Sequence, residues 1–406
     1  MLQKEYRDTI ELYACGMKGT FPEGDRVYSK AEIEEIEKIA RMQGVWTVVF
    51  AVLKKLSENG RLDFAITDIP KWQMEINLKV MEYTLRQEAM YRFVEEKLSF
   101  ANPITLKGDL ISDLYADPAL RMSGDTDLLI DPKDEKAVLN AFVQEGGDYK
   151  PRGENNNQSV CVHPKAGKFE IHISLDTKEV TEVWYDNLDF GAEEKRSVIL
   201  RNGHIVTALG ITDGAINMVL HVLKHLISGI SHLKMLGDAI LYLSHYADEI
   251  DFTRVDAVMA RLGYTSVYET IKRIGVSYFG FSNLTSSEQY DDLVDKLLGD
   301  LMFCAQNGYQ EEVLSAYTEY SRLRYENYHN KNYGEYKFEL VRREVKGRLF
   351  PKKTVLYQDY PVLMKHGYLL PIIWVVRIFK KFFGKKTVVQ TQQNPRMELL
   401  KELDLL

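Results

Sequence analysis

Cysteine is scarce in this sequence. The 406 residues contain three cysteines, Cys15, Cys161 and Cys304, and no two of them form a CxxC pair. A zinc site built on cysteine is therefore excluded, and an odd number of widely spaced cysteines argues against a disulfide framework. Because such frameworks belong to oxidising compartments, we expect a protein of the cytoplasm.

Long hydrophobic runs and an excess of positive charge are also missing. The longest apolar stretch, residues 368–376, is too short to span a bilayer, and the first 16 residues lack the basic and apolar regions of a secretory signal. Lys and Arg number 52 against 59 Asp and Glu, which gives a net charge of −7. This balance argues against a broad basic surface for duplex nucleic acid. It leaves open a nucleotide substrate, because metal ions can mediate that contact.

The rest of the composition is that of a globular protein. Hydrophobic residues make up 45% and charged residues 27% of the chain, and at roughly 150 residues per domain the length predicts about two to three domains. The pattern of elements predicts an α/β protein of the α+β type in four parts. These are an N-terminal helical region (1–100), an α/β core with a small mixed sheet (101–205), a helical bundle (206–340) and a C-terminal extension (341–406).

Helix signals lie on both sides of the predicted α/β core. Ser29 and Glu32 have the spacing of a capping box at the start of a helix. Apolar residues then recur at helical spacing, which predicts helices over residues 45–56, 71–98, 214–227 and 232–246. Within the core, short apolar runs predict strands over residues 104–106, 126–130, 159–163 and 169–175, with helices over 109–115 and 134–144.

Four polar residues in the core predict a cation site. Residues two apart on a strand share a face, so Asp125 and Asp127 project together from one strand, and Glu170 and His172 from another. Carboxylates gathered in this way repel one another unless a cation lies between them. Oxygen ligands suit Mg²⁺ or Mn²⁺. Phosphoryl transfer uses such ions to align the attacking oxygen and to neutralise a triphosphate.

Each piece also has an ordinary structural interpretation. Asp-x-Asp before an apolar run can be a solvated strand entry or a helix cap, and the Gly108 that follows Lys107 can be only a turn. Arg121 can be a surface residue paired with Asp117 or Asp125. The later strand with Glu170 and His172 can simply have one solvent-exposed face. The occurrence of all these pieces in this order favours the cation site.

In order along the chain, the segments LKG, LYADPALR, GDTDLLI and FEIH resemble the bacterial family of uncharacterised nucleotidyltransferases, which belongs to the superfamily of polymerase-beta-like fold. The resemblance covers about residues 75–250. It implies a small mixed nucleotidyltransferase sheet and the transfer of a nucleoside monophosphate from an NTP such as ATP to an acceptor, with release of pyrophosphate. Asp125, Asp127 and Glu170 would bind Mg²⁺ or Mn²⁺, and Glu170 would also activate the acceptor hydroxyl.

The same resemblance implies which residues meet the nucleotide. The backbone at Gly108 would approach the phosphates closely, since glycine has no side chain. Lys107 and Arg121 would neutralise the triphosphate, and an arginine can do so bidentately.

Four further residues would line the nucleotide or acceptor cleft by this resemblance, namely His172, His221, His225 and Asp238. His221 and His225 are at positions i and i+4, so they share one face of a helix. Two other interpretations of this pair stay open. One is a metal site, for which the sequence fixes no third ligand. The other is a polar contact between packed helices.

The turn departs from the superfamily pattern. Asp109 follows Gly108, where the superfamily usually has Gly-Ser or Gly-Gly, and an acid beside the phosphates is unfavourable if its side chain points inward. The alternative function is therefore a catalytically inactive nucleotide-binding or regulatory protein on the same fold.

The C-terminal extension contains a basic segment from Tyr368 to Lys386 in which aromatic residues alternate with lysines. A basic amphipathic helix of this kind can lie on an anionic membrane surface, which would make the protein membrane-peripheral, or it can contact a partner. Alternatively, its apolar side docks on the body of the protein. Residues 396–406 are predicted to form a tail helix that either binds a partner or frays.

Overall fold

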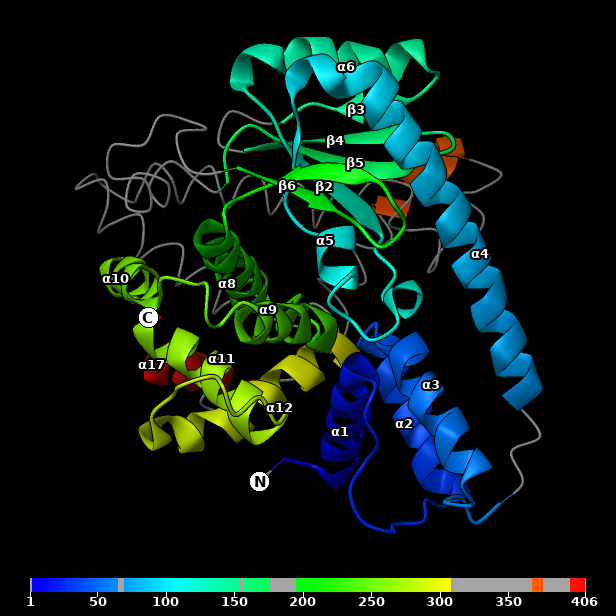
Figure 1. The fold of residues 1–406 in the computed structure, drawn as a ribbon, viewed down its shortest axis with the longest axis vertical. Coiled ribbons are helices and arrows are strands. Elements are labelled where there is room, and N and C mark those ends of the chain that lie inside the picture. Colours follow the sequence, from blue (N-terminus) through cyan, green and yellow to red (C-terminus); the bar gives the residue numbers. More distant parts are fainter. Residues whose placement is uncertain are drawn as a thin grey trace.

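The computed structural model describes residues 2–64, 69–152, 157–175, 195–307, 367–371, 373–374 and 395–405. A mixed sheet covered by helices lies above a body of packed helices (Figure 1). This arrangement confirms the predicted α+β class.

The sheet has seven strands among the described residues, in the order β3-β4-β5-β2-β1-β7-β6. β2 pairs in parallel with β5, and β1 with β7, whereas the other neighbours are antiparallel. The bounds are β1 (Ile104–Thr105), β2 (Asp125–Leu129), β3 (Asp148–Lys150), β4 (Gln158–His163), β5 (Gly167–His172), β6 (Arg196–Ile199) and β7 (Ile205–Ala208).

Three of these strands were not predicted. β3 is a short edge strand, and β6 and β7 form a hairpin that adds to β1. Ile199 and Ile205 of this hairpin are exposed. The hairpin therefore lacks the one-sided apolar pattern by which a half-buried strand is identified in a sequence.

Two helices cover one face of the sheet, α4 (Ile69–Phe93) and α6 (Glu135–Gln144). The rings of Phe93 and Phe142 lie 4.7 Å apart between their centroids, and those of Phe142 and Phe169 lie 5.0 Å apart. Since side chains alternate along a strand, the residues next to Phe169 point to the opposite face, toward the helical body. The polar site is built on that opposite face.

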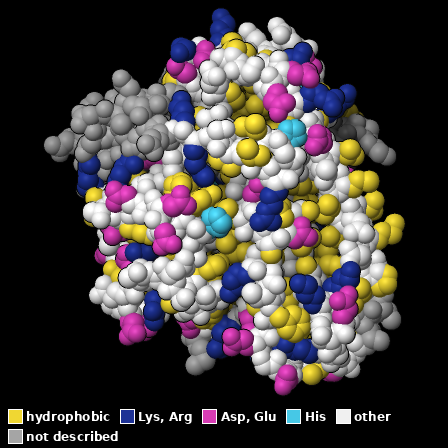
Figure 2. Space-filling view, viewed as in Figure 1, with side chains coloured by type: hydrophobic (Ala, Val, Ile, Leu, Met, Phe, Trp, Pro, Cys, Tyr) yellow, Lys and Arg dark blue, Asp and Glu magenta, His cyan; other side chains and the backbone are white. Residues whose placement is uncertain are grey.

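α4 follows the predicted helix 71–98 closely, and the chain continues through one π-helical turn, Val94–Leu98. Its apolar residues divide between two sides. Trp72, Ile76 and Tyr83 are buried, whereas Met81 and Leu85 are more than half exposed. Figure 2 shows hydrophobic side chains along the edge of the molecule that α4 forms.

The helical body joins segments from both ends of the sequence. A single hydrophobic cluster takes residues from the N-terminal helices and from the helices that follow the sheet, so the described parts of regions 1–100 and 206–340 share one core. Its helices are α1 (Lys4–Lys18), α2 (Lys30–Met42), α3 (Trp46–Glu58), α8 (Ile211–Ile227), α9 (Leu233–His245), α10 (Phe252–Leu262), α11 (Thr265–Ser277) and α12 (Asp291–Asn307).

The predicted capping box is confirmed at the start of α2. The side chain of Ser29 accepts from the amide of Glu32, and the Glu32 carboxylate accepts from the amide of Ser29 at 2.8 Å. Both contacts satisfy amides that a helix start leaves unpaired.

The C-terminal tail helix, α17 (Pro395–Glu402), docks on α12. Leu400 and Leu403 are buried in the shared core, and Arg396 forms an ion pair with Asp300. The tail is therefore neither frayed nor free for a partner along this face. Most of the basic segment 368–386 lies outside the described residues. None of the described helices is both long and apolar enough to cross a membrane.

Candidate functional site

A glycine turn after β1 opens the site. Gly108 has φ 76° and ψ −118°, a backbone conformation that residues with a side chain rarely adopt. A Cβ added to Gly108 would meet no atom within 4 Å. Glycine is therefore required here by the backbone conformation and not by a lack of room for a side chain. The turn faces open space, through which a ligand can approach the backbone.

Asp109 does not leave a free acid in that space. Its carboxylate is buried and accepts hydrogen bonds from two tyrosines of α4, Tyr83 at 2.7 Å and Tyr91 on the other oxygen. These contacts tie the short helix α5 (Asp109–Ser112) to α4. Asp109 thus has a structural role in anchoring the turn.

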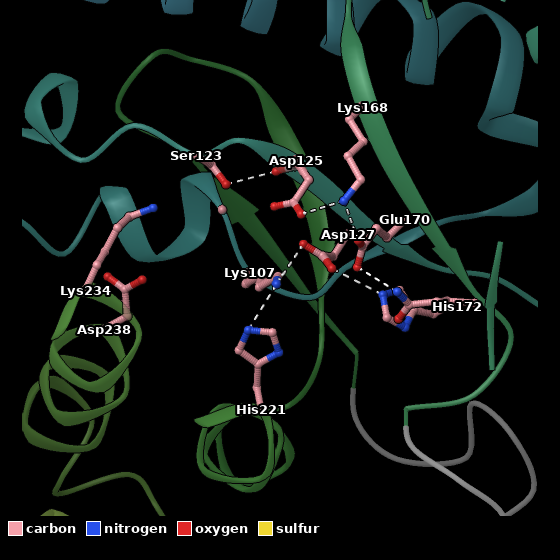
Figure 3. A network of polar contacts seen from close by, with 12 residues as sticks. Lys107, Ser123, Asp125, Asp127, Lys168, Glu170, His172, His221, Lys234 and Asp238 are labelled. Carbon is pink, nitrogen blue, oxygen red and sulfur yellow. Dashed lines mark hydrogen bonds and ion pairs between the residues drawn. The ribbon is translucent and has the colours of Figure 1, made fainter. Parts of the chain in front are cut away.

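The acidic residues of the site come from two parallel neighbours, β2 and β5. The register places Asp127 directly opposite Glu170, Asp125 opposite Lys168 and Leu129 opposite His172. Because directly paired residues of neighbouring strands point the same way, the two pairs of polar side chains gather on one face of the sheet. Figure 3 shows them converging above α8 and α9.

Asp127 is at the centre of this cluster. It is only 3% exposed, its Oδ1 lies 3.2 Å from His172 Nε2, and its Oδ2 lies 3.3 Å from Lys107 Nζ. Burial raises the pKa of Asp127, but Lys107 and His172 outweigh this effect and hold the pKa well below its usual range. The carboxylate is therefore ionised in the folded protein.

Lys168 is a site residue that the sequence interpretation missed. Its Nζ lies 2.6 Å from Glu170 and 3.3 Å from Asp125, so it bridges these two carboxylates. The other oxygen of Glu170 accepts from Gln158 at 2.9 Å. Alternation along the strand was the available signal, since Lys168 is two residues before Glu170 and shares its face.

Asp127, Glu170 and His172 form the one group of three ligand-type side chains found among the described residues that can hold a metal ion. Each offers an atom, and the three atoms lie within 4.8 Å of one another. Asp125 lies on the same face and is paired with Lys168.

Arg121 and Asp238 form a buried ion pair behind the turn. Arg121 is 4% exposed, its guanidinium bonds both oxygens of Asp238, and its Nη1 donates to the carbonyl of Gly108 at 2.9 Å. Asp238 also accepts from Tyr115 at 2.7 Å. The structure therefore places Arg121 where it holds the glycine turn on α9, and it places Asp238 beneath that turn.

His221 lies on the helix below the carboxylates, with its Nε2 3.1 Å from Lys107 Nζ (Figure 3). Burial, reinforced by the charge of Lys107, lowers its pKa well below the usual value, so the ring is neutral and can accept a hydrogen bond from the lysine. His225 packs edge-on against it at 4.5 Å between ring centroids. Lys107 thus connects Asp127 with this pair.

Lys234 was not among the predicted site residues, although it is four residues before Asp238 in the sequence. Its Nζ donates to the carbonyl of Met122 at 2.8 Å, and burial lowers its pKa to about 7. An amine in this state gains or loses its proton near neutral pH. It lies on α9, one turn before Asp238 (Figure 3).

Comparison with protein families gives one match. The model of the family described as "Uncharacterised nucleotidyltransferase" matches residues 29–280, a range that contains every residue of the site described above. Comparisons with curated proteins and with solved structures returned no match. Since the match covers more than half of the 406 residues, the chain belongs to the uncharacterised nucleotidyltransferase family.

Proposed function

We propose that this protein transfers a nucleoside monophosphate from an NTP to an acceptor in a Mg²⁺- or Mn²⁺-dependent reaction that releases pyrophosphate. One observation carries the proposal. Asp127 and Glu170 are paired in register on neighbouring strands, on the same face as Asp125 and beside the open turn at Gly108. Membership of the family supports the general class of reaction.

The residues fit a divalent cation, because a buried ionised carboxylate lies beside a second carboxylate and an imidazole. Asp127 and Glu170 would hold the ion, with Asp125 on the same face. When bound, the ion supplies positive charge and Lewis acidity at the phosphates.

The chain's own groups would orient the reactants. The backbone at Gly108 approaches the phosphates, and Lys107 neutralises their charge from its position between Asp127 and His221. Arg121 keeps the turn in place through the Gly108 carbonyl and does not itself reach the nucleotide. Glu170 accepts the proton of the attacking hydroxyl. To do so, its carboxylate must give up the ion pair with Lys168 and contact the hydroxyl instead.

Thermal unfolding tests whether nucleotide binds at this site. Each NTP, with Mg²⁺ or Mn²⁺, should stabilise the wild type. A ligand at about a hundred times its dissociation constant adds about 2.7 kcal/mol to the free energy of unfolding. Asp127→Asn should lose this metal-dependent shift, because the ionised carboxylate is removed.

Asp131→Asn is the matched control, since Asp131 is a more exposed carboxylate just beyond the other end of β2. It should keep the shift. A shift that survives in Asp127→Asn would place the nucleotide elsewhere. A pyrophosphate assay with pooled hydroxyl acceptors then distinguishes an enzyme from a protein that only binds nucleotide. An enzyme releases pyrophosphate in the wild type and not in Asp127→Asn, whereas a binding protein releases none in either.

A further inference from the structure

The proposed cation site has an unusual set of side chains. Asp127, Glu170 and His172 offer ligand atoms within 4.8 Å of one another. Asp125, the other acid of the Asp-x-Asp motif, is bonded to the ammonium of Lys168 at 3.3 Å. The grouping therefore includes an imidazole and leaves out one of the two motif carboxylates.

Two buried atoms of this set have no hydrogen-bond partner, Oδ2 of Asp127 and Nδ1 of His172. Lys107 Nζ lies 3.3 Å from that oxygen as an ion pair and 3.1 Å from His221 Nε2, whereas Nδ1 of His172 has no such neighbour. Both side chains are more than nine-tenths buried. A buried polar atom without a hydrogen bond is costly, and the carboxylate oxygen already faces one positive charge, so the grouping is suited to a cation.

The charges nearby favour one ion over two. Asp125, Asp127 and Glu170 carry three negative charges, and Lys107 and Lys168 carry two positive charges within 3.3 Å of them. Together these five groups carry one net negative charge. A single divalent ion already reverses this balance, and a second one would have to displace the Lys168 ammonium from between Asp125 and Glu170.

We propose that the chain binds one first-row transition-metal ion through Asp127, Glu170 and His172, and that the ammonium of Lys168 takes the place of a second cation beside Asp125. An imidazole ligand favours such an ion over Mg²⁺, which takes oxygen ligands. The inference rests on the cation site of the proposed function, but it does not depend on turnover.

Electron paramagnetic resonance with Mn²⁺ alone, on the full chain without nucleotide, tests this directly. The decrease of the free Mn²⁺ signal during a titration measures the bound ions and should give one ion per chain. Mg²⁺ should displace Mn²⁺ only with an affinity that is weaker by about tenfold or more. The modulation of the bound signal should show coupling to the nitrogen of an imidazole. This readout needs no substitution, so a variant that fails to fold cannot obscure it.

Variants assign the ligands. His172→Gln should weaken Mn²⁺ binding about tenfold or more and remove the nitrogen coupling. The control is His204→Gln, which should change neither the affinity nor the coupling. His204 lies beside Glu88 of α4 and Glu95 of the π-helical turn that follows α4. Lys168→Met should raise the stoichiometry from one ion to two. Two ions in the wild type, or no nitrogen coupling, would overturn the proposal.

Failure of this inference and failure of the proposed function can be told apart. If Mn²⁺ binds through His172 but no acceptor pool yields pyrophosphate, the ligand assignment stands and the transferase proposal fails. If His172→Gln keeps full Mn²⁺ affinity while transfer proceeds, the transferase proposal stands and the assignment of His172 fails.

Discussion

At the scale of single residues, Gly108 has the most constrained backbone of the site. Replacement by alanine should cost about 1–3 kcal/mol, because the backbone is held at φ 76° and ψ −118° while the added Cβ meets nothing within 4 Å. We expect Gly108→Ala also to lose the stabilisation by nucleotide, since the methyl group would stand where the phosphates approach.

Gly203 supplies the control for this change. It has φ 88°, lies in the turn between β6 and β7, and also has no atom within 4 Å of an added Cβ. Urea unfolding of Gly203→Ala should show a similar loss of stability with an unchanged response to nucleotide. An equal response to nucleotide in both variants would show that the Gly108 turn does not meet the phosphates.

Between elements, the Arg121–Asp238 pair fixes the glycine turn on α9. Asp238→Ala should cost about 3–5 kcal/mol in urea unfolding, because it leaves the Arg121 charge buried without a counter-charge. The double change Arg121→Met with Asp238→Leu should recover much of this loss, since it removes both charges. A loss below about 1 kcal/mol for Asp238→Ala would contradict a buried ion pair.

The histidines of α8 make stability depend on pH. Burial, with Lys107 nearby, lowers the pKa of His225 to about 4, so the unfolded chain takes up a proton before the folded one does. Its contribution is fully present above pH 6.5 and is lost as the pH falls from about 6.5 toward about 4. His221 shifts in the same direction.

The measurement is the unfolding midpoint from pH 7.5 to 4.5. The wild type should lose more stability over this range than His225→Gln, because the variant has no proton to take up. Carboxylates titrate in both proteins, so the difference between the two profiles isolates His225. Parallel profiles would contradict the role assigned to its burial.

At the scale of the whole molecule, the two ends of the chain close one core. Leu400 of α17 is 1% exposed, so Leu400→Ala should cost about 2–5 kcal/mol. Lys401 is exposed on the same helix, so Lys401→Ala should change stability by less than about 0.5 kcal/mol. Thermal unfolding measures both, and equal small effects would mean that the tail does not dock in solution.

The shared core also shows why part of the architecture escaped prediction. Helices over 45–56, 71–98, 214–227 and 232–246 were confirmed as α3, α4, α8 and α9, because apolar residues at helical spacing are a local signal. No local signal says that α1 to α3 pack with α8 to α12. That choice depends on contacts between residues far apart in the sequence.

The site divides in the same way. Strand alternation alone placed Asp125 with Asp127 and Glu170 with His172, whereas the register between β2 and β5 brought the two pairs to one face of the sheet. The sequence could not identify the partner of Arg121, because Asp238 is 117 residues away in the chain, whereas Asp117 and Asp125 are near in sequence. The anchoring of Asp109 by Tyr83 and Tyr91 is likewise a contact between separate elements.

The sequence by itself determined the class of fold, the order of the motifs and the candidate carboxylates, because propensity, alternation and capping act over a few residues. Only the tertiary structure decided which charges meet. It paired Arg121 with Asp238 in the interior, set Lys168 between Asp125 and Glu170, and brought His172 to Asp127. Such pairings are decided by burial, since a charge removed from water requires a partner from whatever part of the chain the packing brings near.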